Sequence, residues 1–277
     1  MIKLGDYNTL KVARRADQGI YLEGDEKSGD ILLPNKYVPN DIEIGQELDV
    51  FIYLDHEERL IATTERPFVK VGEFASLEVA WINKYGAFMK WGLMKDLFCP
   101  FREQKKRMEV GKRYIVYVKE DVESHRLMAT AKVERYIEGE NVQLKHGEAC
   151  DCLVWQKTDL GFKVIINNRY QGLIYDNQIF QPLYSGCRLT AYIDHVRQDG
   201  KIDVTLQPTG RQHTLDFAEV LLRYLHENEG YCNLGDKSDA NLIYDCFKVS
   251  KKAYKKAIGD LYRRRLIVIE DECIRLV

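Results

Sequence analysis

The chain has 277 residues, a formal charge of −2, 45% hydrophobic residues, 30% charged residues and 11% aromatic residues. This composition is typical of a folded soluble protein and excludes a disordered chain, and the length allows more than one domain. The first ten residues hold no basic region followed by an apolar run, and no stretch approaches about 18 consecutive apolar residues. We therefore expect no secretory signal, no membrane-spanning helix and a cytoplasmic protein.

The chain repeats itself three times before its last segment. Gly19, Gly86 and Gly161 begin the similar segments "GIYL", "GAFM" and "GFKV". Six other sets of similar residues correspond in the same way when the three copies are aligned. The first step is 66 or 67 residues and the second is 75. This period is too long for a solenoid repeat, so each copy is predicted to be a small domain. The predicted domains are residues 1–68, 69–138 and 144–209, of which the third is divergent.

Each copy has the pattern of a small all-β domain. Short runs rich in Val, Ile, Leu, Tyr and Phe alternate with Gly, Asp, Asn and Pro, as in a chain of five strands. In the first copy these runs are residues 9–14, 19–23, 29–34, 48–55 and 59–64. In the second copy they are residues 77–83, 86–91, 96–100, 113–120 and 126–132. Five short strands in about 65 residues predict a barrel of the OB type. The glycine that opens the second strand is expected where a side chain would clash.

Residues 211–277 have a different pattern, with a helical period. A first helix is predicted to end at Gly230, a second to run from a Ser238 cap through Phe247, and a third to follow a Ser250 cap. A β-hairpin in residues 266–277 completes the pattern of an α+β winged helix-turn-helix domain. The predicted fold is therefore multidomain and mainly β, with three tandem OB-type barrels before a winged helix.

The predicted third helix is amphipathic. We expect six residues to face inward: Ala253, Tyr254, Ala257, Ile258, Leu261 and Tyr262. Its outward face carries Lys251, Lys252, Lys255, Lys256 and Arg263. Lysine is a poor choice for bidentate reading of bases, so this face favours phosphate contacts over a specific operator. A plain solvated helix face is the alternative.

The phrase "KYGAFMKW", the strands after it and "VGKRYIVYVK" resemble the S1 RNA-binding domain, a variety of OB-fold. Three such copies before a winged helix, with "ILLPNKYVP" in the first, resemble the conserved virulence factor B family of bacterial RNA-binding regulators. This resemblance implies that RNA lies across strands two and three of a barrel. It implies stacking aromatics at Tyr21 in copy one and at Phe88, with Tyr85, in copy two. The basic residue before the last strand corresponds to Arg59 or Arg126.

Two departures from the S1 pattern stand out. Pro34 and Pro100 replace the histidine that usually closes the third strand. Copy three has Lys163 at the aromatic position, with Phe162 shifted by one residue onto the opposite face. We therefore do not expect copy three to bind RNA in the usual way.

The residues themselves also indicate a surface for single-stranded nucleic acid, because aromatic rings stack on bases beside cations that contact phosphates. Strand alternation places Phe88 and Lys90 on the face opposite Ala87, Met89 and Trp91. The predicted RNA-binding residues are Tyr21, Phe88, Tyr85, Lys84, Lys90, Arg59, Arg126, Arg14 and Arg15. The alternative is that the rings pack within or between the barrels. The basic loop at residues 101–113 lies beside this face and is otherwise an ordinary solvated loop.

No enzyme is expected. The six histidines show no metal-ligand spacing and no nucleophile partner, and the chain has no phosphate-cradling Gly-rich motif. The seven cysteines are scattered, and Cys150 and Cys152 read as buried reduced thiols, with a labile metal or redox role as the alternative. No cofactor is predicted.

Single-stranded RNA is the predicted partner, and the family resemblance implies a post-transcriptional regulator. Two other functions fit the same residues. One is a DNA-binding transcriptional regulator that acts through the winged helix. The other is a factor that docks on ribosomal or other proteins. Residues 1–70 favour this last function, because they carry 9 basic and 14 acidic residues, a net charge of −5.

Overall fold

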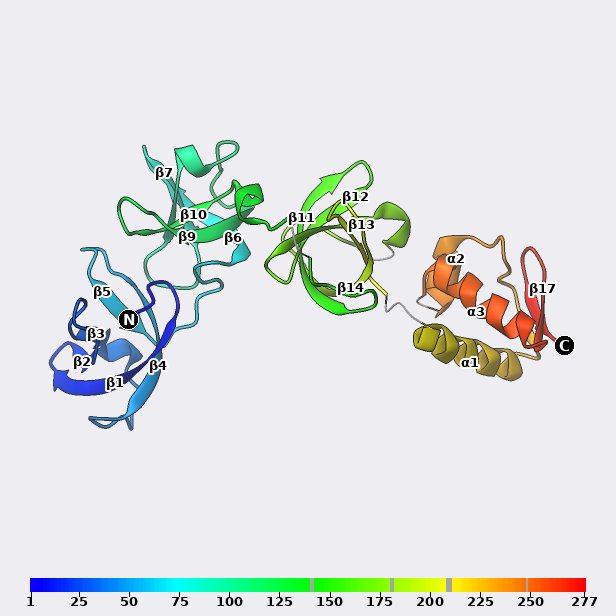
Figure 1. The fold of residues 1–277 in the computed structure, drawn as a ribbon, viewed down its shortest axis with the longest axis horizontal. Helices are drawn as coiled ribbons and strands as arrows, with labels where there is room; N and C mark the ends of the chain where they lie inside the picture. Colours follow the sequence, from blue (N-terminus) through cyan, green and yellow to red (C-terminus); the bar gives the residue numbers. More distant parts are fainter. Residues whose placement is uncertain (140–141, 180–181, 208–210, 248) are drawn as a thin grey trace. The chain divides into compact units, whose positions relative to one another are not determined.

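The computed structural model describes residues 1–139, 142–179, 182–207, 211–247 and 249–277 (Figure 1). Contacts divide the chain into two compact units, Met1–Ile137 and Glu138–Val277, which are described separately. The first unit contains two closed five-stranded barrels, barrel 1 and barrel 2. The second contains a third closed barrel, barrel 3, and a domain of three helices with a small sheet. The predicted fold class is therefore confirmed. Within the described residues, no helix is both long enough and apolar enough to cross a membrane.

The three barrels share one topology, with the fifth strand inserted between the third and the fourth. This is the Greek-key closure of an OB-type barrel. The strands of barrel 1 are β1 Tyr7–Ala16, β2 Gly19–Leu22, β3 Ile31–Pro34, β4 Glu47–Leu54 and β5 Leu60–Thr63. Those of barrel 2 are β6 Phe74–Ile82, β7 Gly86–Lys90, β8 Leu97–Pro100, β9 Arg113–Glu120 and β10 Leu127–Thr130. Those of barrel 3 are β11 Ala149–Thr158, β12 Gly161–Ile166, β13 Tyr170–Tyr175, β14 Arg188–Val196 and β15 Ile202–Thr205.

The recurring glycine opens the second strand of each barrel because a side chain has no room there. A Cβ atom at Gly19, Gly86 or Gly161 would lie 2.1, 2.4 or 2.0 Å from a carbonyl oxygen of the third strand. Real Cβ atoms essentially never approach a neighbour below 3.0 Å. The structural role predicted for this glycine is therefore confirmed.

A β-bulge recurs in the first strand of each barrel. The pairing register shifts between Val12 and Arg14 in β1 and between Val79 and Trp81 in β6. The corresponding shift in β11 lies between Val154 and Gln156. A bulge inserts one unpaired residue, so the side chains beyond it change face. It therefore decides which residue of the first strand meets the second strand on the outer surface.

Barrel 1 and barrel 2 share a hydrophobic core. Phe51 and Tyr53 of β4 belong to the same buried cluster as the core of barrel 2. The ring of Phe51 meets that of Trp91 edge-on, with centroids 5.8 Å apart. Lys70 Nζ lies 2.9 Å from Asp6 Oδ1, which adds an ion pair between residues of the two repeats. The two barrels therefore pack as one unit.

The C-terminal domain has the predicted winged-helix elements. Its helices are α1 Arg211–Glu227, α2 Ala240–Phe247 and α3 Lys251–Arg263, and its sheet has the order β16-β18-β17. The strands are β16 Tyr231–Cys232, β17 Ile267–Ile269 and β18 Ile274–Leu276. The hydroxyl of Ser250 accepts a hydrogen bond from the Ala253 N–H at 3.1 Å, so the predicted cap of α3 is confirmed.

Two details of this domain differ from prediction. Asp239, not Ser238, caps α2, because its Oδ1 accepts from the Asn241 N–H at 2.7 Å. Ser238 is buried and instead accepts from the Gly235 N–H at 2.7 Å. Tyr262 is 58% exposed rather than facing inward. It follows the fully buried Leu261, and one residue along a helix turns the side chain by about 100°.

Candidate nucleic-acid interface

The bulge sets up one matched pair of side chains on the outer surface of each barrel. The pairs across strands one and two are Arg14 with Tyr21, Trp81 with Phe88, and Gln156 with Lys163. The pair therefore consists of a cation and a phenol in barrel 1, of two aromatic rings in barrel 2, and of an amide and an amine in barrel 3. Only the pair of barrel 2 is made of two rings.

Barrel 2 carries a row of three aromatic rings on neighbouring strands, the aromatic ladder: Trp81 of β6, Phe88 of β7 and Phe98 of β8. The rings of Trp81 and Phe88 are parallel within 3°, with centroids 3.7 Å apart. The centroids of Phe88 and Phe98 are 4.9 Å apart. Trp81 is 46% exposed, and its Nε1 donates a hydrogen bond to Asp96 Oδ2 at 3.0 Å, which orients the indole. Because Phe88 is half-buried between its neighbours, Trp81 is the exposed end of the stack.

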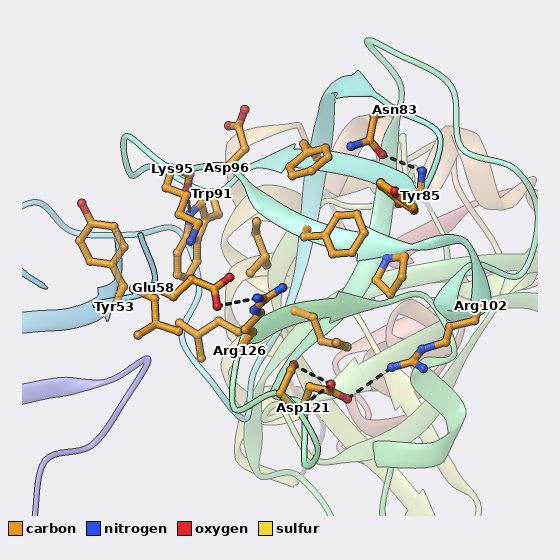
Figure 2. A pocket seen from close by; sticks show the side chains of 18 of the residues that line it. Tyr53, Glu58, Asn83, Tyr85, Trp91, Lys95, Asp96, Arg102, Asp121 and Arg126 are labelled. Atoms are coloured by element: carbon orange, nitrogen blue, oxygen red, sulfur yellow. Dashed lines mark hydrogen bonds and ion pairs between the residues drawn. The ribbon is translucent and has the colours of Figure 1, made fainter. Parts of the chain in front are cut away.

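A pocket of about 800 Å³ adjoins the aromatic ladder, and both Phe88 and Phe98 line it. Figure 2 shows this pocket from close by. Tyr85 lies at its edge and is 62% exposed. The turn before β7 is held by Asn83, whose Oδ1 accepts from the N–H groups of Tyr85 at 2.8 Å and Gly86 at 3.1 Å. The predicted site residues Phe88 and Tyr85 therefore lie on one continuous surface.

Trp91 has a structural position in this region. It is 2% exposed, and its Nε1 donates to the Lys95 carbonyl oxygen at 2.6 Å. Ala87 and Met89 are buried as well, whereas Lys90 is exposed. The predicted alternation along β7 is therefore confirmed.

Tyr21 of barrel 1 does not present a bare ring. The Arg14 guanidinium carbon lies 3.7 Å from the centroid of the Tyr21 ring, so this cation covers one face. Arg14 also pairs with Asp30 at 3.3 Å. Arg15 is directed elsewhere, because its Nη2 donates to the carbonyl of Ile42. Barrel 1 thus brings Tyr21 and Arg14 together but leaves Arg15 apart from them.

Arg59 and Arg126, the corresponding cations of barrels 1 and 2, are both paired with carboxylates. Arg59 donates to Asp55 Oδ2 at 2.8 and 2.9 Å, and Glu57 lies 2.9 Å away. The hydrogen bond that Arg59 donates to Asp55 raises the pKa of the Arg59 guanidinium above its ordinary value. Arg126 of barrel 2 donates to Glu58 of barrel 1. Part of the positive charge of these two cations is therefore already matched by a carboxylate.

The remaining cations of barrel 2 differ in their partners. Lys90 pairs with Glu78 at 2.7 Å. Lys84 Nζ lies 5.0 Å from the centroid of the Tyr85 ring, at cation–π distance. In the basic loop, the Arg107 guanidinium carbon lies 3.5 Å from the Phe101 ring centroid, and Phe101 lines the pocket. Lys84 and Arg107 are therefore cations placed beside aromatic rings of this surface.

The outward face of α3 is partly neutralised. Lys255 pairs with Asp236 at 2.9 Å, Lys252 with Asp194 at 3.7 Å and Arg263 with Asp260 at 3.6 Å. Lys251 Nζ donates to the Lys237 carbonyl at 3.2 Å. In the described part of the chain, Lys256 makes no ion pair within 4 Å. The predicted face exists, but much of its charge is already matched.

Barrel 3 lacks the aromatic pair. Lys163 Nζ lies 5.5 Å from the centroid of the buried Trp155 ring, and Phe162 packs against the core. Cys150 and Cys152 are buried with their Sγ atoms 3.7 Å apart. The hydrogen bond with Cys150 and burial raise the pKa of the Cys152 thiol well above its usual range. Across the described residues, no group of three His, Cys, Asp or Glu side chains is arranged to hold a metal ion.

Trp81 and Phe98 were not predicted from the sequence. Strict alternation from Leu77 and Val79 points Trp81 into the core, but the bulge at Ala80 turns it outward. The signal that could have found it is the repeat itself, because Trp81 occupies the column of Arg14. Phe98 lies in a predicted strand, directly across from Phe88.

Comparison with known proteins confirms the resemblance to the conserved virulence factor B family. Residues 4–65 match the family model of the S1 domain, and residues 219–276 match that of the CvfB-like winged helix domain. The protein YitL of Bacillus subtilis is 27% identical over 289 residues, which cover 96% of this chain and 91% of YitL. Conserved virulence factor B of Staphylococcus epidermidis is 24% identical over 244 residues, which cover 86% of this chain and 82% of that protein.

A crystal structure of a multidomain protein with nucleic acid binding domains from Streptococcus pneumoniae aligns with a TM-score of 0.43. The two chains are 19% identical, and the alignment covers 99% of this chain and 98% of the other. The S1 and winged-helix matches of the present chain support nucleic-acid binding.

Proposed function

We propose that the chain binds single-stranded RNA through the aromatic ladder of barrel 2 and acts as a post-transcriptional regulator in the bacterial cytoplasm, without enzymatic activity. The observation that supports this most is the ladder itself. Trp81, Phe88 and Phe98 form one row across three strands, on the face where S1-type barrels are expected to hold RNA. A row of rings that ends in a half-exposed indole offers a base a flat surface on which to stack.

Base stacking, more than charge, supplies the affinity in this proposal. Each base stacked on an aromatic ring contributes about 1–3 kcal/mol, with little regard to sequence. Arg14, Arg59, Lys90 and Arg126 are each paired with a carboxylate, so few cations are available to phosphates. For single strands, each phosphate contact makes the slope of log K against log salt more negative by about 0.7. With about three contacts, a shallow slope of about −2 is expected.

Barrel 1 and the winged helix contribute weaker contacts to the same strand. Tyr21, covered by Arg14, offers a smaller stacking surface than the ladder. Lys256 on α3 is available for a phosphate. Linking weak sites on one chain raises overall affinity through effective concentration.

The test is fluorescence anisotropy of labelled single-stranded RNA and duplex DNA across a salt series. Trp81→Ala/Phe88→Ala is expected to weaken RNA binding at least tenfold, while Phe68→Ala is expected to have no effect. Phe68 is a matched control because it is 69% exposed and belongs to neither the ladder nor the pocket. RNA binding that survives the double substitution would refute the proposal.

DNA binding through the winged helix is the second candidate, supported by the exposed lysines of α3. It predicts tighter binding to duplex DNA than to RNA, loss of that binding in Lys252→Glu, and no effect of Phe88→Ala. A docking protein would instead show no salt-sensitive affinity for either nucleic acid. The same titrations separate all three functions.

A further inference from the structure

The pocket beside the aromatic ladder, which we call the junction pocket, has walls from two barrels. Tyr53 and Leu54 of β4 and Glu58 of the following turn come from barrel 1, whereas the other lining residues come from barrel 2 or the segment around it (Figure 2). Tyr53 and Trp91 are almost fully buried and form an aromatic part of the lining. The site therefore exists only where barrel 1 packs on barrel 2, and no single barrel contains it.

The charges of the junction pocket suit a neutral ring better than a phosphate. Three basic and four acidic side chains line it. Arg126 is paired with Glu58, and Arg102 lies 3.5 Å from Asp121. Lys95 Nζ donates to the Asp55 carbonyl oxygen at 2.6 Å, and burial lowers the pKa of its amine. A phosphate entering this lining would meet more negative than positive charge. An uncharged aromatic base would not incur that repulsion.

We propose that the junction pocket binds one nucleobase, splayed out from the RNA strand on the aromatic ladder, and selects a base that carries an exocyclic amino group. The inference rests on the proposed function. The ladder and the pocket are continuous, because Phe88 and Phe98 belong to both. A pocket of about 800 Å³ accommodates a base with its sugar. Unstacked bases of RNA are read on their edges by polar side chains, while aromatic side chains stack on their faces.

The selectivity comes from the carboxylates of the pocket. An ionised carboxylate only accepts hydrogen bonds, so it pairs with the amino group of adenine or cytosine. Uracil presents a carbonyl oxygen in place of that amino group, which a carboxylate repels. Asp96 already holds the Trp81 indole through Oδ2. Glu58 reaches the pocket from barrel 1 and contacts Arg126 through Oε2.

Glu58 is the group we assign to base selection. Of the two carboxylate oxygens of Glu58, only Oε2 accepts a hydrogen bond from the described residues. Oε1 is therefore left to accept one from a base. Glu57 is a matched control because it lies in the same turn, has the same charge and pairs with Arg59 outside the pocket. Glutamine at either position removes one negative charge and keeps the shape of the side chain.

The experiment titrates full-length wild type, Glu58→Gln and Glu57→Gln with labelled oligo(A), oligo(C) and oligo(U) of about 12 nucleotides, a length within the site sizes of OB-type barrels. The wild type is expected to bind oligo(A) or oligo(C) about tenfold more tightly than oligo(U). Glu58→Gln is expected to remove that preference, mainly by binding oligo(U) more tightly. Glu57→Gln is expected to keep the preference.

The outcomes separate the inference from the function on which it rests. If the wild type binds all three strands equally, or if both variants behave alike, the junction pocket does not read an amino group. The proposal that RNA binds through the aromatic ladder would still hold if Trp81→Ala/Phe88→Ala loses RNA binding. If no strand binds the wild type, the proposed function and this inference both fail.

Discussion

Gly86→Ala tests whether the close approach of two strands in barrel 2 requires glycine. The new Cβ would lie 2.4 Å from the Cys99 carbonyl oxygen, 2.7 Å from Phe98 Cε2 and 2.8 Å from Pro100 Cα. Two of these three atoms belong to backbone, so a rotamer change cannot relieve the contact. To reach an ordinary contact of 3.4 Å, β8 must move away from β7 by about 1 Å.

The magnitude follows from what that movement disturbs. Overpacking of this kind costs about 1–3 kcal/mol, and a weakened backbone hydrogen bond between β7 and β8 adds about 1 kcal/mol. We therefore expect Gly86→Ala to destabilise the unit of barrels 1 and 2 by about 2–4 kcal/mol. Because Phe98 is displaced with β8, RNA affinity is expected to fall as well.

The assay is urea denaturation followed by tryptophan fluorescence in a Trp155→Phe background. The two remaining tryptophans, Trp81 and Trp91, both lie in barrel 2, so the signal reports that barrel. Gly259→Ala in α3 is the control, since a Cβ there meets nothing within 4 Å. Alanine in a helix is favoured over glycine by about 0.5–1 kcal/mol, so this change is expected to stabilise the helices. Far-UV circular dichroism reports them, because within the described residues the α-helices, α1 to α3, all lie in the winged-helix domain.

If the free energy of unfolding of barrel 2 in Gly86→Ala lies within about 0.5 kcal/mol of the wild-type value, this explanation is wrong. The strands would then absorb a Cβ without cost, and the glycine column would need another explanation. A loss of stability in Gly259→Ala equal to that in Gly86→Ala would point to a general effect of alanine substitution instead.

Three other outcomes are expected. Trp91→Ala should destabilise barrels 1 and 2 together by about 3–5 kcal/mol in urea denaturation followed by hydrogen exchange of each barrel, and two separate transitions would contradict a shared core. Hydrogen bonds from the Ile2 N–H and from Ser28 hold the pKa of Asp25 well below its ordinary value of 3.8. Its contribution to stability is therefore fully present above that value and is lost as the pH falls toward the lowered pKa. In Asp25→Asn, the stability of barrel 1, measured by hydrogen exchange, should fall less steeply as the pH is lowered. The same pH dependence in the variant and the wild type would contradict this role of Asp25. Lys256→Glu should reduce the salt slope of RNA binding by about 0.7, and no change would remove α3 from the interface.

The barrels and the winged helix could be predicted because local signals agree with the fold. The recurring glycine, the period of the repeat and the cap at Ser250 each depend on residues close in sequence. The surface was harder to predict. Trp81 is turned outward by a bulge at Ala80 that no composition signal marks, and Glu58 meets Arg126 from 68 positions away. Contacts between repeats depend on how two domains pack, which a pattern within one repeat does not contain.

The three barrels share a backbone but not a surface. At the position after the bulge, Arg14 covers a phenol, Trp81 extends a stack and Gln156 faces an amine. If the barrels were interchangeable binding sites, selection for stacking would act on the same column in each, and an aromatic pair would be expected three times. A single ladder, with barrel 1 closing the pocket beside it, instead favours a division of roles in which barrel 2 holds the strand and barrel 1 reads a base. Glu58→Gln in the full chain should therefore keep the stacking surface of barrel 2 but remove the carboxylate with which barrel 1 reads the base.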